Sequence, residues 1–459
     1  MARFAMLCIC LVSLLPAASH AVTYERIADI NPGFGGGGAG GLTVYDGDLY
    51  FIANNVAHGS NNELWKWDGA AVSQAAEIRP GDEGSGINSL AVHDGKLYFS
   101  ARDDDSTLEL WSYDPVGGAQ EIPDNSPAWN PQTHAELISY GANLYFRATD
   151  FSTVGTELGK YDGTSQAVVN IAPGATTSYP QGFILYNNAL HFLANGADGA
   201  GSELFSYNGT AVTRLTDIDP GPDAGDPRNM AVYDGDLYFS GKDGVRGNEL
   251  WRYDPLVVPA GASLVADIVV GGIYDSGNPS NMTPYNGKLY FSADDGSGVG
   301  NELWRYDVVT DTAALFWNIN QLPPPSGGED PEHESWPSEF FEYDGILYFA
   351  ADDGVHGREL WATDGTAAWL VLDIYPGEYG SGVGGFCIYD GDLYFSADDG
   401  QTGSELAYIQ GEYTQTTAIF RLPEPATLTV LTFGALGVLV SRRRRSVFRH
   451  TRRRAGDGY

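Results

Sequence analysis

A glutamate followed by leucine recurs at eight places spaced 46 to 57 residues apart along the chain. The eight copies are Glu63, Glu109, Glu157, Glu203, Glu249, Glu302, Glu359 and Glu405. Each could ligate Ca²⁺ together with a preceding acidic pair, such as Asp294-Asp295 or Asp352-Asp353, because Ca²⁺ prefers oxygen ligands. Alternatively, each carboxylate accepts backbone N–H groups and holds a tight loop of its own repeat.

The repetition of this glutamate favours the structural role. A catalytic centre needs one set of residues, whereas this glutamate occurs in all eight repeats. We therefore predict that the eight glutamates stabilise the repeats, and we assign no catalytic residue, no metal ligand and no cofactor. Calcium in some of the Asp/Gly loops stays open as the alternative, although these loops do not match the 12-residue EF-hand pattern.

Other catalytic patterns are absent from the sequence. The histidines form no H-E-x-x-H, and no G-x-S-x-G occurs. Gly33–Gly38 spells G-x-G-x-x-G without the helix that dinucleotide binding requires, so we interpret it as a connector. One irregular insertion, Gln321–Ser338, is rich in proline and acidic residues. Such loops are usually only solvated, but a ligand site that occurs once in the chain is expected here first.

The glutamates belong to a repeat whose strands can be read from the first unit. The tripeptide Leu-Tyr-Phe begins at Leu49, Leu97, Leu144, Leu237, Leu289, Leu347 and Leu393, and Leu190-His191-Phe192 is an altered copy. In the first unit we expect strands at residues 42–45, 49–53, 64–67 and 72–78. Asp46-Gly47 joins the first two as a two-residue turn of the type that requires positive φ.

Three consecutive large apolar residues indicate a strand that is covered on both faces. Small sheets packed face to face, with a repeat of about 47 residues, are typical of a β-propeller. We predict an all-β propeller of eight four-stranded blades over residues 22–421; seven blades and a divergent hairpin is the alternative. Several units end in Ile-x-Pro-Gly, as at Ile78–Gly81, and residues 28–33 match this motif before the first unit. The N-terminal segment is therefore expected to complete the last blade, unless residues 417–420 do so.

The repeat resembles a known bacterial sequence family. Glu359-Leu360-Trp361-Ala362-Thr363-Asp364-Gly365-Thr366 is similar to the ELWxxDGT repeat of extracellular proteins, and the other copies are weaker. The resemblance covers nearly all of residues 24–420. It implies a surface-exposed, propeller-like domain and no specific activity.

Both ends of the chain have the features of targeting segments. Residues 1–21 begin with Arg3, continue through an apolar stretch and end in Ser19-His20-Ala21, which is typical of a cleaved signal peptide. Near the other end, Pro423-Glu424-Pro425 precedes an uncharged apolar run, for which we predict a transmembrane helix over residues 426–441. The cluster Arg442, Arg443, Arg444 and Arg445 and the basic tail 446–459 should stay cytoplasmic.

The C-terminal elements, in this order, resemble the PEP-CTERM sorting domain. The resemblance covers residues 422–445 and implies processing by an exosortase, with Pro423, Glu424 and Pro425 as the recognised triplet. It further implies that the protein is exported, is anchored in the inner membrane before processing, and then reaches the cell surface or an exopolysaccharide matrix.

Charge narrows the choice of partners. The formal net charge is −35, which repels phosphate backbones and argues against nucleic-acid binding. We expect a non-catalytic binding or structural propeller at the cell surface, with exopolysaccharide as a candidate partner. The alternative is a polysaccharide-active hydrolase or lyase; a hydrolase would need two carboxylates roughly 5 to 9 Å apart.

Overall fold

Each repeat folds as a run of antiparallel strands because its turns carry residues that tolerate a left-handed backbone. In the first repeat, Asp46 has a φ of 48° and Gly47 a φ of 87°, as a two-residue hairpin turn requires. The strands flanking this turn are β2 (Gly40–Tyr45) and β3 (Asp48–Ala53), followed by β4 (Glu63–Trp67) and β5 (Val72–Ala76). The four strands expected from the sequence are thus confirmed, to within two residues at each end.

The structure is a computed structural model that describes residues 22–410, apart from residues 33–35, 55–61, 82–83, 104–107, 124–128, 131–135, 151–154, 174–176, 222–223, 258–260, 273 and 323–333. Contacts divide the chain into Ser19–Thr414 and a second unit of Met1–Ala18 with Gln415–Tyr459. The second unit contains the predicted signal peptide core, sorting signal and transmembrane helix, and it lies outside the described residues.

Eight sheets follow one another along the described chain, and each is an antiparallel meander of four strands, with one extra strand in the third. Blade 1 is given above. The other blades are, in order, β6 (Asn88–His93), β7 (Lys96–Ala101), β8 (Glu109–Asp114), β9 (Gly118–Glu121); β11 (Ile138–Tyr140), β12 (Asn143–Asp150), β13 (Gly155–Tyr161), β14 (Gln166–Val169), with the extra β10 (Trp129–Asn130); β15 (Gln181–Tyr186), β16 (Ala189–Asn195), β17 (Ser202–Tyr207), β18 (Val212–Arg214); β19 (Arg228–Tyr233), β20 (Asp236–Gly241), β21 (Glu249–Tyr253), β22 (Ala262–Ala266); β23 (Ser280–Tyr285), β24 (Lys288–Ala293), β25 (Glu302–Asp307), β26 (Thr312–Trp317); β27 (Ser338–Tyr343), β28 (Ile346–Asp352), β29 (Arg358–Thr363), β30 (Ala368–Leu372); and β31 (Gly384–Tyr389), β32 (Asp392–Asp398), β33 (Ser404–Gln410), β1 (Thr23–Arg26).

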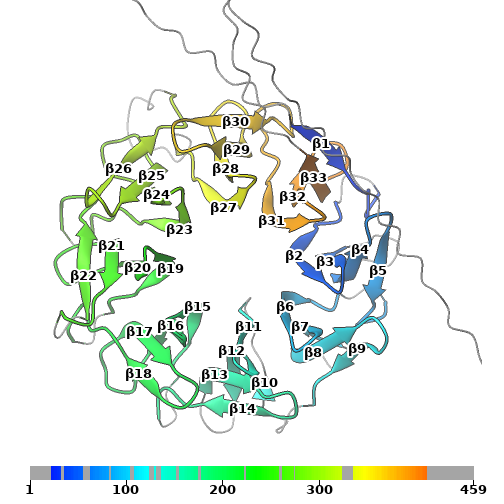
Figure 1. The fold of residues 1–459 in the computed structure, drawn as a ribbon, viewed down its shortest axis with the longest axis horizontal. Coiled ribbons are helices and arrows are strands. Elements are labelled where there is room, and N and C mark those ends of the chain that lie inside the picture. Colours follow the sequence, from blue (N-terminus) through cyan, green and yellow to red (C-terminus); the bar gives the residue numbers. More distant parts are fainter. Residues whose placement is uncertain are drawn as a thin grey trace, which may run out of the picture. The chain divides into compact units, whose positions relative to one another are not determined.

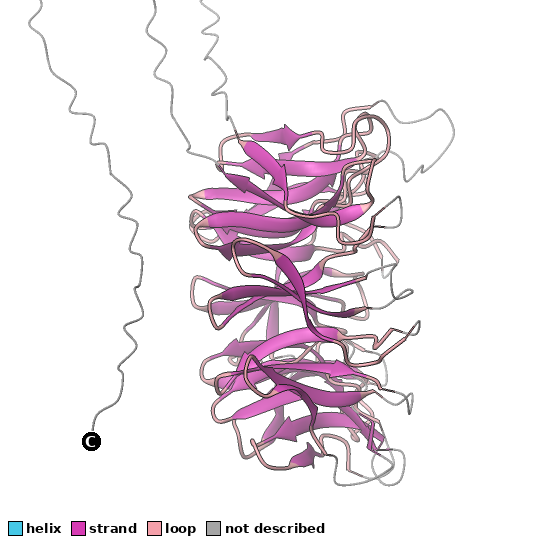
Figure 2. Cartoon of the chain, turned by 90° about the vertical axis from the view of Figure 1, so that its right-hand side faces the viewer, coloured by secondary structure: helices cyan, strands magenta, loops and turns pink. Residues whose placement is uncertain are grey.

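These sheets stand as blades around a central axis, with the first strand of each blade innermost and the last outermost (Figure 1). Seen from the side, the sheets form one layer with loops on both faces (Figure 2). The prediction of an eight-bladed, four-stranded, all-β propeller is confirmed, and the seven-bladed alternative is wrong. The described residues contain no helix, and therefore none that could cross a membrane.

The core consists of eight clusters, one between each pair of neighbouring blades. Tyr50 of blade 1 packs with Leu97 and Phe99 of blade 2, and the equivalent residues meet at the other interfaces except that between blades 4 and 5, where His191 replaces the tyrosine. The Leu and Phe of the repeated tripeptide point to one neighbour and the Tyr to the other. Leu49, Tyr50 and Phe51 are all 0% exposed, as expected of a strand that is covered on both faces.

A ring of hydrogen bonds links each blade to the next at the inner turns. The tyrosine that ends an inner strand donates its hydroxyl to a turn carbonyl of the following blade. These bonds are Tyr45 to Gly95 (2.9 Å), Tyr140 to Asn188 (2.6 Å), Tyr186 to Gly235 (3.1 Å), Tyr233 to Gly287 (2.9 Å), Tyr285 to Gly345 (2.8 Å), Tyr343 to Gly391 (2.9 Å) and Tyr389 to Gly47 (3.1 Å). In blade 2 the position is His93, whose Nδ1 lies 2.8 Å from Ser139 Oγ. The bond from Tyr389 to Gly47 joins the last blade to the first.

The N-terminal strand completes the last blade, as the sequence predicted. Strand β1 pairs antiparallel with β33 and forms the outer edge of that blade. The strand is Thr23–Arg26, directly before the phrase at residues 28–33, and Ile27 N–H continues the pairing by donating to Leu406 O at 2.9 Å. The two ends of the described chain therefore close the ring together.

We predict that Tyr389→Phe lowers the free energy of unfolding by about 1 kcal/mol, because the Gly47 carbonyl loses its partner while the ring still fills the core. Chemical denaturation measures the change. The control is Tyr274→Phe, at a side chain that is 92% exposed. Equal denaturation midpoints for the two variants would contradict a stabilising role for the closing bond.

Candidate functional site

All eight repeated glutamates lie at the start of the third strand of their blades or one or two residues after it. They are buried, with exposures between 0% and 9%. In Glu302 the carboxylate accepts the backbone N–H of Ile319 at 2.7 Å and of Asn320 at 3.3 Å, and the Ser335 hydroxyl at 2.7 Å. The donors come from the segment that leaves the fourth strand and from the connector to the next blade.

The same contact recurs around the ring. Backbone N–H groups donate to Glu63, Glu157, Glu203, Glu249 and Glu359 from the equivalent segments, with an isoleucine N–H in every case. In the last blade, Glu405 accepts Ile30 N–H at 3.1 Å and Gly37 N–H at 2.7 Å. These donors lie near the N-terminus, so this carboxylate also binds the two ends of the propeller together.

Burial has the largest effect on the pKa values of these glutamates. It raises the pKa of Glu249, Glu302 and Glu405 to about 7, although the N–H donors that face each carboxylate oppose the shift. Burial also raises the pKa of Glu63, Glu157, Glu203 and Glu359. A carboxyl group in this setting can take up a proton near neutral pH, yet its contacts are to backbone N–H groups and hydroxyls of the loops that it holds.

The acidic pairs proposed as calcium ligands also bind their own loops. Asp352 Oδ1 accepts Gly354 N–H at 2.7 Å, and Asp353 Oδ1 accepts the N–H groups of Val355 and His356, both at 2.9 Å. Asp294 and Asp295 cap their loop in the same way. Within the described ranges, no three His, Cys, Asp or Glu side chains are grouped so that they could hold a metal ion. Calcium binding stays a prediction.

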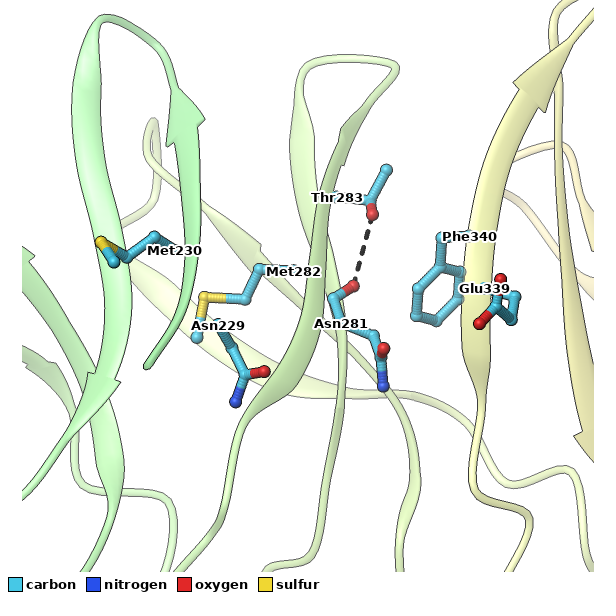
Figure 3. A pocket seen from close by; sticks show the side chains of 7 residues that line it. All are labelled: Asn229, Met230, Asn281, Met282, Thr283, Glu339 and Phe340. Carbon is cyan, nitrogen blue, oxygen red and sulfur yellow. Dashed lines mark hydrogen bonds between the residues drawn. The ribbon is translucent and has the colours of Figure 1, made fainter. Parts of the chain in front are cut away.

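A hollow of about 300 Å³ lies on the inner strands of blades 5, 6 and 7. It is lined by Asn229, Met230, Asn281, Met282, Thr283, Glu339 and Phe340, which Figure 3 shows on three neighbouring strands. Asn229, Asn281 and Glu339 are exposed, Met282 is buried, and Met230 and Phe340 are half-buried. The lining therefore combines an apolar floor with two amides and a single carboxylate.

Sequence reasoning did not single out any residue of this hollow, because the lining comes from three repeats about 50 residues apart. A comparison of the units at this position would have shown the signal, since Gly41, Gly182 and Gly385 occupy it in other blades. Of the insertion expected to carry a unique site, residues 323–333 lie outside the described residues. Its end, Ser335 and Trp336, bonds to the Asn301 carbonyl and leads into β27.

The remaining predicted site residues lie outside the described part of the chain. They are the sorting-signal residues Pro423, Glu424, Pro425, Arg442, Arg443, Arg444 and Arg445. Their roles stay predictions.

Comparison with known proteins assigns no family and no activity to this chain. No family model matches the chain, and no curated protein matches it. Solved structures with a similar fold include a puromycin hydrolase (14% identity, TM-score 0.44, covering 81% of this chain and 60% of that one). Another is the β-propeller domain of the Trilobed protease from Pyrococcus furiosus (12% identity, TM-score 0.43, covering 74% of this chain and 98% of that one). A third is oligogalacturonate lyase from Vibrio parahaemolyticus (12% identity, TM-score 0.43, covering 73% of this chain and 96% of that one). The chain thus spans only 60% of the puromycin hydrolase.

We predict that Glu302→Gln flattens the dependence of stability on pH. The pKa of Glu302 is about 7 in the folded protein and 4.5 ordinarily. Between about pH 4.5 and pH 7 the folded protein therefore binds a proton that the unfolded protein has lost. The stability linked to this proton is fully present below about pH 4.5 and is lost as the pH rises through 7. In the variant, the free energy of unfolding should decrease by roughly 3 kcal/mol less over this pH range than in the parent.

The measurement is the free energy of unfolding from denaturant titrations between pH 4.5 and 8. Glu77→Gln, at an exposed glutamate, is the matched control and should keep the pH dependence of the parent. If Glu302→Gln and the control follow the same curve, the buried carboxyl is not the titrating group.

Proposed function

We propose that this chain is an exported cell-surface or matrix protein whose propeller is a non-catalytic binding or structural module. The observation that carries this proposal is the use of the repeated carboxylates. Seven of the eight accept hydrogen bonds from the backbone of their own blade or, for Glu405, from the segment that completes it. The most regular candidates for chemistry are therefore engaged in holding blade corners.

The proposed location of the protein follows from the two ends of the sequence. Residues 1–21 direct export, and an exosortase recognises Pro423, Glu424 and Pro425. A helix over residues 426–441 anchors the precursor in the inner membrane, with Arg442–Arg445 on the cytoplasmic side. After processing, the propeller resides at the cell surface or in the extracellular matrix.

The partner that best suits this address is an exopolysaccharide. The net charge of −35 disfavours polyanions, including nucleic acids. The alternative function, hydrolysis or elimination on a polysaccharide, is less well supported by the hollow on blades 5 to 7. A glycoside hydrolase needs two carboxyl groups roughly 5 to 9 Å apart, and Glu339 is the one carboxylate among the seven residues that line the hollow.

Purified protein should bind polysaccharide without cleaving it. The test is retention of soluble and insoluble glycans combined with assays for new reducing ends and for unsaturated products. Both assays are repeated with a chelator, which also tests the Ca²⁺ alternative. New chain ends at a rate proportional to protein concentration would overturn the non-catalytic proposal.

Deleting residues 422–459 should release the propeller into the medium, because the chain then lacks the triplet, the apolar helix and the arginine cluster. Immunoblotting of cells and culture medium measures the distribution. Deletion of residues 446–459 alone, which leaves all three elements in place, is the control and should keep the wild-type distribution. A propeller that stays cell-bound after the larger deletion would refute the sorting role.

A further inference from the structure

The polar residues of the hollow occupy one structural position in three successive blades. Seven of the eight inner strands contain a register shift after their first residue, which marks a β-bulge. The bulged residue has a left-handed backbone: φ is 51° at Asn229, 54° at Asn281 and 59° at Glu339. In the bulge of blade 6, Thr283 Oγ1 donates to the Asn281 carbonyl at 3.3 Å (Figure 3).

Glycine is the residue that suits this backbone, and blades 1, 4 and 8 have it, as Gly41, Gly182 and Gly385. Glu339 departs furthest from that preference, since a long side chain in the left-handed region is strained. Because three other blades form the same bulge with glycine, the fold does not require the side chains of Asn229, Asn281 and Glu339.

These three side chains keep most of their hydrogen-bonding capacity. Asn229 Nδ2 donates to Pro279 O and Asn281 Nδ2 to Ser280 Oγ, both at a long 3.4 Å. Glu339 Oε2 accepts Gly385 N–H at 3.2 Å. Within the described part of the chain, the amide oxygens of both asparagines and Glu339 Oε1 accept no hydrogen bond. The hollow thus presents donors and acceptors side by side above an apolar floor of Met230, Met282 and Phe340.

An exposed aromatic ring stands three residues before Glu339. Trp336 is 52% exposed and has a φ of 45°, at a second left-handed position where blades 1, 2 and 8 have glycine. Its backbone is held on both sides: its N–H donates to Asn301 O at 3.2 Å, and Arg358 Nη1 donates to its carbonyl at 2.7 Å. The backbone of Trp336 is thus held in place, and its solvent-exposed indole offers an apolar face for stacking.

Charged groups of both signs lie around the bulge of blade 7. Arg358 is half-buried, and the negative charges of Glu339 and Asp352 oppose the burial that lowers the pKa of its guanidinium. With a net charge of −35 on the whole chain, an anionic ligand is repelled. Glu339 is the one carboxylate among the seven lining residues and is exposed to water, so it gives no strong preference for a cation.

We infer that the inner strands of blades 5, 6 and 7 form a binding site for a neutral saccharide. Asn229, Asn281 and Glu339 exchange hydrogen bonds with its hydroxyl groups, and the C–H face of a ring packs on Met282 or Phe340. Trp336, which is not one of the seven lining residues, provides a second stacking surface three residues before Glu339. The volume of about 300 Å³ is at the lower end for small-molecule sites and suits one or two sugar units. This inference rests on the proposed function and specifies where the glycan binds.

The test uses the full-length protein in mild detergent and titrates maltohexaose, cellohexaose and laminarihexaose, with a polyuronate as the charged comparison. Two variants are compared with the parent: Asn229→Gly combined with Asn281→Gly, and Trp336→Ala. The glycine substitutions suit the left-handed backbone, so the melting temperature should be unchanged or higher. Affinity for the neutral oligosaccharide that binds should fall at least tenfold in both variants.

The matched control is Tyr179→Ala. Tyr179 is 53% exposed, has a φ of 47° and occupies in blade 4 the position that Trp336 has in blade 7. Its loss should leave affinity unchanged. Wild-type binding that persists in both test variants would overturn the assigned site while leaving the proposed function intact. Preference for the polyuronate would overturn the neutral class, and failure of the parent to bind any of the four glycans would overturn both proposals.

Discussion

Closure of the ring is the constraint on which the rest of this structure depends. A single blade cannot bury its own apolar faces, because Leu and Phe of each repeated tripeptide need the Tyr side of the preceding blade. Opening the ring between blades 8 and 1 would expose Leu49 and Phe51 together with Tyr394. Each such side chain contributes about 1.5–3 kcal/mol when fully buried, which is a large fraction of the stability of an ordinary protein. The Tyr389–Gly47 bond acts at this interface, while the β1–β33 pairing and Glu405 hold the N-terminal segment on blade 8.

The buried glutamates show how the blades remain rigid at a cost. A carboxylate without water is unfavourable unless several donors face it, and the donors here are backbone N–H groups of connectors that have no strand to pair with. One side chain therefore satisfies groups that would otherwise be buried without partners. The raised pKa values show that the donors do not fully offset the cost of burying the charge. Repetition of this arrangement indicates a scaffold element, because each copy serves only its own corner.

Periodicity was sufficient to predict the blades but not the contacts between them. Three consecutive apolar residues and the Asp-Gly turns define each strand pair locally, so the number of blades, the strands of the first unit and the N-terminal closure could be predicted. The hydrogen bonds that link the inner tyrosines to the next blade could not be predicted. Tyr233, for example, donates to a carbonyl 54 residues later, and only the closed propeller brings the two together. The hollow escaped prediction for the same reason. Its amides lie in separate repeats, and each alone is an ordinary polar residue in a strand.

In a repeat protein, positions where the repetition breaks carry more functional information than positions where it holds. Each blade must form the same bulge and the same connector, and glycine does so without strain at Gly41 and Gly385. Side chains take the bulge position in blades 5, 6 and 7, as Asn229, Asn281 and Glu339, and these three blades adjoin one another. Three neighbouring bulges that carry polar side chains and line one hollow show how a symmetric scaffold can hold a single site.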